Sequence, residues 1–209
     1  RNLTTPFGTD FVLREWDDEL YISGTDFPDG CAYDANGCYF SARTWDPSSG
    51  SYTAITDLDN IITGGTGLEL FIGDNLSTFA AQTLTSSGTI SNDASVPMTV
   101  ESQWNLIGNP MHCPVDFDDL TRNDAGIGNY FYVLNSSTNA FEYWDGINQV
   151  ASVATLNGGK ISSHQGIWVF KSNAGTSSIT FDQGAKDTVS ADNFMKSNLN
   201  DIPADFFKI

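Results

Sequence analysis

The chain has 209 residues, of which 40% are hydrophobic and 12% aromatic, so it is long and apolar enough to bury a core. Nine Lys and Arg residues against 26 Asp and Glu residues give a formal net charge of −17. A surface this acidic repels nucleic-acid phosphates and anionic membranes, which argues against both as partners. The sequence also contains no run of about 18 apolar residues, so we expect no membrane insertion.

Asp residues dominate the acidic side chains, with 21 Asp against five Glu. Asp favours turns and caps whereas Glu favours helix interiors, so this bias predicts many turns and very little helix. The expected strands, in chain order, are 20–22, 39–45, 51–55, 67–73, 83–90, 96–100, 104–107, 130–134, 141–144, 166–171 and 178–181. Residues 115–120 are expected to form one helical turn.

The two halves of the chain follow a similar pattern. An aromatic hairpin near residue 40 resembles one near residue 131, and the apolar run that begins at Gly67 resembles the run that begins at Gly166. These features recur at offsets of about 91 and 99 residues. The pattern predicts an all-β protein, an antiparallel β-sandwich of jelly-roll-like type. We expect halves at 1–102 and 103–209, either as two packed units or as one continuous sandwich.

The centre of the chain carries the most specific sequence pattern. Residues 104–110 read Trp-Asn-Leu-Ile-Gly-Asn-Pro, and Pro-Val-Asp-Phe follows at 114–117. This stretch resembles the WNLIGNP signature of secreted and cell-surface β-rich modules of Bacteroidota, which are substrates of type IX secretion. Residues 165–169 and 179–181 fall in the same order as in that family, and the resemblance covers roughly residues 50 to 195. Residues 111–113 depart from the family, in which Tyr-Pro-Ser is usual.

The resemblance implies an extracellular β-rich module without known catalytic residues, and the cysteines fit the same compartment. Cys31 and Cys38 flank a turn-prone loop, so we expect a disulfide between them and therefore an oxidising environment. Their spacing, without a second matching pair, is not typical of a zinc site. Cys113 is then expected to be a small buried residue. Because Arg1 begins the chain without a signal peptide, we interpret it as a mature or excised product of a secreted protein.

Two catalytic alternatives are open in the sequence. A Cys113 thiolate could be activated by His112 or His164, although adjacent strand residues point to opposite faces, which argues against His112. A pair of carboxylates for glycoside cleavage could be drawn from Glu69, Glu101 and Glu142. Pairs of this kind also arise by chance in so acidic a chain, so we predict that the protein is not an enzyme.

Acidic loops make Ca²⁺ the best candidate for a bound ion, because hard cations prefer oxygen ligands. The candidate ligands are Asp29, Asp34, Asp57, Asp59, Asp116, Asp118 and Asp119. None of these loops matches an EF-hand, and turn or cap roles account for the same residues. The sequence predicts no other cofactor.

Three aromatic residues near strand ends, Trp45, Tyr143 and Trp144, are candidates for a sugar-stacking face, although core packing is the default reading for such side chains. Trp168 lies in an apolar run and is expected in the core. Asp187-Thr188-Val189 fits an O-glycosylation pattern of Bacteroidota secreted proteins, which makes Thr188 a candidate acceptor. Three N-glycan acceptor patterns also occur.

Together these features predict a non-catalytic, extracellular structural or adhesive module of a cell-surface or fibre-forming protein. The expected partners are like subunits or flanking domains of the same polypeptide. Assembly by strand exchange could involve residues 204–209 or the lead-in around Phe11. The alternative prediction is a carbohydrate-binding module of a larger secreted enzyme, with glycans as its ligands.

Overall fold

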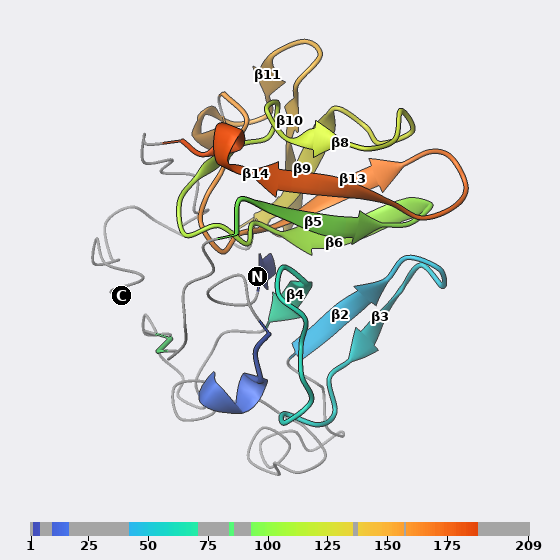
Figure 1. Ribbon diagram of the computed structural model, residues 1–209, viewed down its shortest axis with the longest axis vertical. Helices are drawn as coiled ribbons and strands as arrows, with labels where there is room; N and C mark the ends of the chain where they lie inside the picture. The colour runs from blue at the N-terminus through green and yellow to red at the C-terminus, as the bar shows by residue number, and fades with distance from the viewer. Residues whose placement is uncertain are drawn as a thin grey trace.

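The computed structural model describes residues 10–16, 42–70, 84–85, 93–135, 138–156 and 158–187 in full, and residues 2–4 as backbone. Within these ranges the protein is built from antiparallel strands with a few short 3-10 turns (Figure 1). None of the helices in this part of the chain is long and apolar enough to cross a membrane. The predicted all-β antiparallel class is confirmed, and the arrangement is that of a β-sandwich.

The C-terminal part forms the sandwich itself. Five strands in the described ranges make one sheet, in the order β11 (Val150–Ala151), β10 (Ala140–Asp145), β9 (Tyr130–Asn135), β13 (Gly166–Lys171) and β6 (Gln103–Gly108). A smaller sheet in the order β5 (Ser95–Val100), β14 (Ser177–Asp182) and β8 (Thr121–Arg122) packs against it (Figure 1). The inward side chains of both sheets form one core, which includes Met98, Ile107, Phe131, Val169 and Phe181.

The N-terminal part contributes a four-stranded sheet within the described residues. Its order is β1 (Asn2–Thr4), β4 (Gly67–Leu70), β2 (Ala42–Asp46) and β3 (Ser51–Ala54). A second core lies here and includes Leu13 and Trp16 from the 3-10 helix η2 (Leu13–Trp16). Phe11 is buried in this core, and its backbone exchanges hydrogen bonds with Ile62. The lead-in around Phe11 is therefore paired within its own chain.

Short elements complete the fold. They are the paired strands β7 (Val115–Asp116) and β12 (Lys160–Ile161) and the 3-10 helices η3 (Ala154–Leu156) and η4 (Gln183–Ala185). The helical turn expected over residues 115–120 is wrong at its start, because Val115 and Asp116 pair with Ile161 and Lys160 as a strand. Buried Val115 contributes to the sandwich core instead.

The five-stranded sheet repeats the strand order of the four-stranded sheet, which matches the internal repeat of the sequence. The order β1-β4-β2-β3 recurs as β6-β13-β9-β10, antiparallel throughout. The turns before β4 and β13 also agree: the N–H of Thr66 donates to the carbonyl of Thr63, and the N–H of Gln165 donates to that of Ser162. In each turn the preceding residue has a positive φ, +80° at Gly65 and 59° at His164. Each half therefore contains one four-stranded unit with this strand order.

The boundary between the halves differs from the division expected after residue 102. β5 precedes that point, yet it pairs along its whole length with β14 and belongs to the C-terminal sandwich. The apolar residues Met98 and Val100 explain this placement, because they face the sandwich core.

The two units meet where β4 contacts β6 and β1 contacts β13. The N–H of Gly108 donates to the carbonyl of Gly65 at 2.9 Å, and Thr66 forms an isolated bridge with Ile107. Gly67 is required at this crossing, because a Cβ there would lie 2.7 Å from backbone atoms of Leu106. This close approach places the outer face of the larger sheet against the β2–β3 hairpin.

Candidate functional site: an aromatic pocket between the two units

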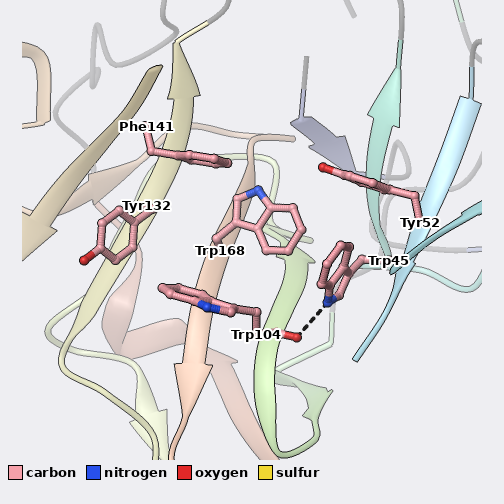
Figure 2. A pocket seen from close by; sticks show the side chains of 6 residues that line it. All are labelled: Trp45, Tyr52, Trp104, Tyr132, Phe141 and Trp168. Atoms are coloured by element: carbon pink, nitrogen blue, oxygen red, sulfur yellow. Dashed lines mark hydrogen bonds between the residues drawn. The ribbon is translucent and has the colours of Figure 1, made fainter. Parts of the chain in front are cut away.

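A pocket of about 440 Å³ opens between the β2–β3 hairpin and the outer face of the five-stranded sheet. Its volume lies within the range of about 300–1,000 Å³ that is usual for small-molecule sites. Aromatic side chains from both units line it (Figure 2), and they are Trp45, Tyr52, Trp104, Tyr132, Phe141 and Trp168. The site is therefore an aromatic pocket shared by the two repeats.

Strand alternation explains why these side chains share one face. Trp168 lies directly opposite Tyr132 on the neighbouring strand, and Trp45 lies opposite Tyr52 in the hairpin. Side chains at adjacent positions point to opposite faces of a sheet, so Phe131 and Val169 enter the sandwich core instead. One face of the larger sheet thus builds the core, and the other builds the pocket.

Trp168 is the centre of the ring arrangement (Figure 2). Trp45, Tyr52 and Phe141 stand almost perpendicular to its indole, at 78°, 88° and 89°, with centroid distances of 4.9, 6.1 and 6.2 Å. The Trp104 ring packs edge-on to Tyr132 with centroids 5.4 Å apart. Perpendicular packing of this kind is favourable for aromatic quadrupoles, and it surrounds the space with ring faces and edges.

One hydrogen bond fixes the two walls of the pocket to each other. The indole N–H of Trp45 donates to the backbone carbonyl of Trp104 at 2.8 Å and so joins the two units (Figure 2). Trp168 is only 6% exposed, and its indole nitrogen is covered and has no hydrogen-bond acceptor among the described residues. Phe141 is 53% exposed and Trp104 is 37% exposed, so they form the open rim.

The phenol of Tyr52 is held in its neutral form. Burial raises the pKa of Tyr52 well above its usual value, and a hydrogen bond to the Glu69 carboxylate together with the charge of that group raises it further. Arg43 lies 4.0 Å from Glu69 and opposes the shift. Tyr52 therefore presents a neutral hydroxyl to the pocket near neutral pH.

The predicted sugar-stacking face is only partly formed. Trp45 lines the pocket, and Tyr143 lies on the same side of the larger sheet, with its ring 5.9 Å from that of Tyr132. Trp144 was the third candidate for this face, but the structure does not place it there. Trp144 is 2% exposed in the sandwich core, where its indole N–H donates to the Asp118 carboxylate. Strand alternation turns Trp144 away from the face that carries Tyr143.

Most of the pocket was missed by sequence reasoning. Trp168 was expected only as a core residue, and Tyr52, Trp104, Tyr132 and Phe141 were not singled out as a site. A signal was present in the aromatic residues at alternate strand positions, which predict a shared face. That pattern does not indicate which strands become neighbours in the sheet.

The acidic residues expected to bind Ca²⁺ have local roles. The Asp57 carboxylate accepts the N–H of Asp59, and Asp59 pairs with Arg14. Asp116 accepts from Lys160 at 2.6 Å, and this lysine also pairs with Asp187.

Asp118 accepts from Trp144 and Gln149, and Asp119 is exposed. Across the described ranges, no three His, Cys, Asp or Glu side chains are gathered as ligands for a metal ion. Asp29 and Asp34 lie outside those ranges, as do Cys31, Cys38 and Thr188, so these predictions stay predictions.

The geometry does not favour a cysteine nucleophile. Cys113 is half-buried, and burial raises the pKa of its thiol, whereas a reactive cysteine requires a lowered pKa. Lys186 lowers it and Asp187 raises it, both as smaller effects. The carboxylates of Glu69 and Glu142 come from different sheets, and Glu142 accepts a hydrogen bond from Ser152.

Comparisons with known proteins add no assignment: no family model matches the chain, and neither curated proteins nor solved structures gave a match. The resemblance of residues 104–110 to the Bacteroidota modules therefore stays a prediction. The class that the fold and site define is an antiparallel β-sandwich of two repeated units with an aromatic pocket between them.

Proposed function

We propose that this chain is a non-catalytic, extracellular adhesive module of a cell-surface or fibre-forming protein, and that it holds its partner in the aromatic pocket. The observation that carries the proposal is the lining of that pocket, which consists of Trp, Tyr and Phe side chains. Such side chains supply contact area and binding energy, but no nucleophile and no acid–base group that works near neutral pH. The site is suited to holding a ligand rather than to converting one.

Two further features support an extracellular role. The net charge of −17 favours solubility and disfavours nucleic-acid partners. Two repeated units packed through β4 and β6 are also typical of chains built from successive modules. Flanking domains of the same polypeptide and like subunits are the expected neighbours.

A second candidate function, a carbohydrate-binding module, is favoured by one specific observation. Tyr143 is 38% exposed beside the pocket rim formed by Trp104 and Phe141, all on one face of the larger sheet. An exposed row of rings can stack on the C–H faces of a neutral sugar chain. In this case the binding surface would extend beyond the pocket along β10.

Adhesion under flow tests the proposal. Beads coated with the chain are passed over bacterial and animal cell layers, and the retained fraction is compared with that of uncoated beads. Phe141→Ser should reduce retention, because it opens the rim without disturbing the core. Tyr143→Ser is the matched control, since it is an exposed aromatic on the same strand that does not line the pocket.

The outcomes separate the candidates. Loss with Phe141→Ser alone supports adhesion through the pocket, and loss with both variants supports stacking on an open glycan-binding face. If coated and uncoated beads are retained equally and the protein sediments as a monomer, both adhesion and assembly fail. Catalytic turnover of any tested glycan or peptide would contradict the non-catalytic assignment.

A further inference from the structure

The pocket combines electron-rich rings with few available hydrogen-bonding groups, because three of the five polar groups in its lining are bonded or covered. The Trp45 indole N–H is already bonded to the carbonyl of Trp104, and the Trp168 nitrogen is covered by neighbouring atoms. The Tyr52 hydroxyl is engaged with Glu69. A ligand that needs several hydrogen bonds therefore finds few partners here, whereas a ligand that needs none loses nothing on entry.

We propose that the pocket binds a quaternary ammonium group, such as a trimethylammonium head carried by a larger molecule. This inference rests on the proposed function, in that it names the chemistry of the ligand held at the same site. A quaternary ammonium carries a full positive charge but no N–H, so it needs no hydrogen-bond acceptor from the lining. Its methyl groups also bury apolar surface against the rings.

The ring geometry favours a compact cation over a flat ligand. Trp45, Tyr52 and Phe141 stand at nearly right angles to Trp168, so rings bound the space on several sides (Figure 2). A cation within about 6 Å of several ring centroids is attracted by the negative face of each quadrupole. A sugar ring, by contrast, gains most from one broad aromatic face on which its C–H groups can stack.

Charge complementarity supports the same occupant. The chain carries a formal charge of −17, which raises the local concentration of cations and opposes entry of anions. Glu69 lies at the Tyr52 side of the pocket, and its cationic partner Arg43 is 4.0 Å away and partly exposed. Anionic glycans and acidic peptides are disfavoured by both features.

Calorimetric titration of the intact chain with choline provides the test, with 3,3-dimethylbutan-1-ol as the matched probe. The two probes have the same shape, but only choline is charged. Choline should bind at least about tenfold more tightly, because attraction to desolvated rings is lost in the neutral probe. Raising the salt concentration should weaken choline binding and leave the alcohol unaffected.

Two variants locate the site. Phe141→Leu should weaken choline binding about three- to fivefold, since it removes one ring from a half-exposed position. Tyr143→Leu should leave the binding constant unchanged, because this residue lies outside the pocket lining. Both residues are exposed, so neither change should disturb folding; matched thermal denaturation curves check this.

The inference is overturned if choline does not bind, if both probes bind equally, or if Tyr143→Leu weakens binding as much as Phe141→Leu does. Binding of a neutral oligosaccharide or a proline-rich peptide to the pocket in place of choline also overturns it. In that event the adhesive function survives, provided that bead retention still depends on Phe141. Absence of bead retention, in contrast, removes the proposed function whether or not choline binds.

Discussion

Asn109, in the central Gly-Asn-Pro segment, offers the sharpest test of the fold. Its side chain is fully buried and makes four hydrogen bonds. The amide nitrogen donates to the carbonyls of Cys113, Ile161 and Ser162 at 3.0, 3.3 and 3.0 Å, and the amide oxygen accepts the N–H of Met111 at 2.9 Å. One side chain therefore holds the turn after β6 to the residues that precede β13.

Replacing Asn109 with Ala leaves a buried N–H and three carbonyls without this partner. With about 1–3 kcal/mol for a buried group left unsatisfied, we expect a loss of roughly 3–5 kcal/mol in the free energy of unfolding. Asn109→Asp keeps the acceptor for Met111 but turns a carboxylate toward three carbonyl oxygens. At neutral pH this variant should therefore be less stable than Asn109→Ala, although it only replaces the amide NH2 group with an oxygen.

The sign of the pH dependence follows from that environment. Burial and the facing carbonyls raise the folded-state pKa of the introduced carboxyl above its unfolded value, so its destabilising effect disappears as the pH falls through the raised pKa. Once protonated, the group can donate again. Urea unfolding followed by tryptophan fluorescence gives the free energy of unfolding of each variant. The Asp variant should be less stable than the Ala variant at neutral pH and more stable than it at about pH 4.5. Parallel pH curves for the two variants would refute the hydrogen-bond assignment.

Three further outcomes are expected. Gly67→Ala should lower the free energy of unfolding by about 2 kcal/mol or more, because the new Cβ meets the backbone of Leu106. Gly50→Ala, in open space at φ +63°, should lower it by about 1 kcal/mol. Equal losses in urea unfolding would contradict this packing. Hydrogen bonds from turn residues lower the pKa of Asp46 and Asp145 below 3.8, so their contribution to stability is present above that pH and lost as the pH falls through the lowered values. When asparagine replaces aspartate at these two positions, the melting temperature should accordingly fall less steeply with decreasing pH than that of the parent protein. Cys113 should react slowly with iodoacetamide at neutral pH and faster as the pH rises toward its raised pKa, and fast neutral labelling would argue against its burial.

Much of the fold could be predicted because strand signals are local. The aromatic hairpin near residue 131, the run from Gly166 and the stretch from Trp104 became β9, β10, β13 and β6. The repeat was also visible in the sequence, since the equivalent units carry similar apolar runs. The failures concern long-range pairing: β5 joined β14 across the chain, and Val115 joined β12 instead of starting a helical turn.

The site was harder to predict because burial and face depend on neighbours that are remote in sequence. Trp144 entered the core and Phe141 did not, although both belong to one aromatic strand. Lys171 shows the same limit, since its ammonium is buried and donates to the carbonyls of residues 173–175, with Asp124 at 3.4 Å. Only the fold of the β13–β14 loop supplies these acceptors, and no local pattern around Lys171 indicates them.

The hydrogen bond from Trp45 to the Trp104 carbonyl has a mechanical consequence. Because the walls of the pocket come from both units, pulling the units apart destroys the pocket, and anything held there resists the pull. At a concentration of 100 times its dissociation constant, an occupant adds about 2.7 kcal/mol to the work of separation. In a tether built from such units, separating the two units would therefore take more force when the pocket is occupied than when it is empty.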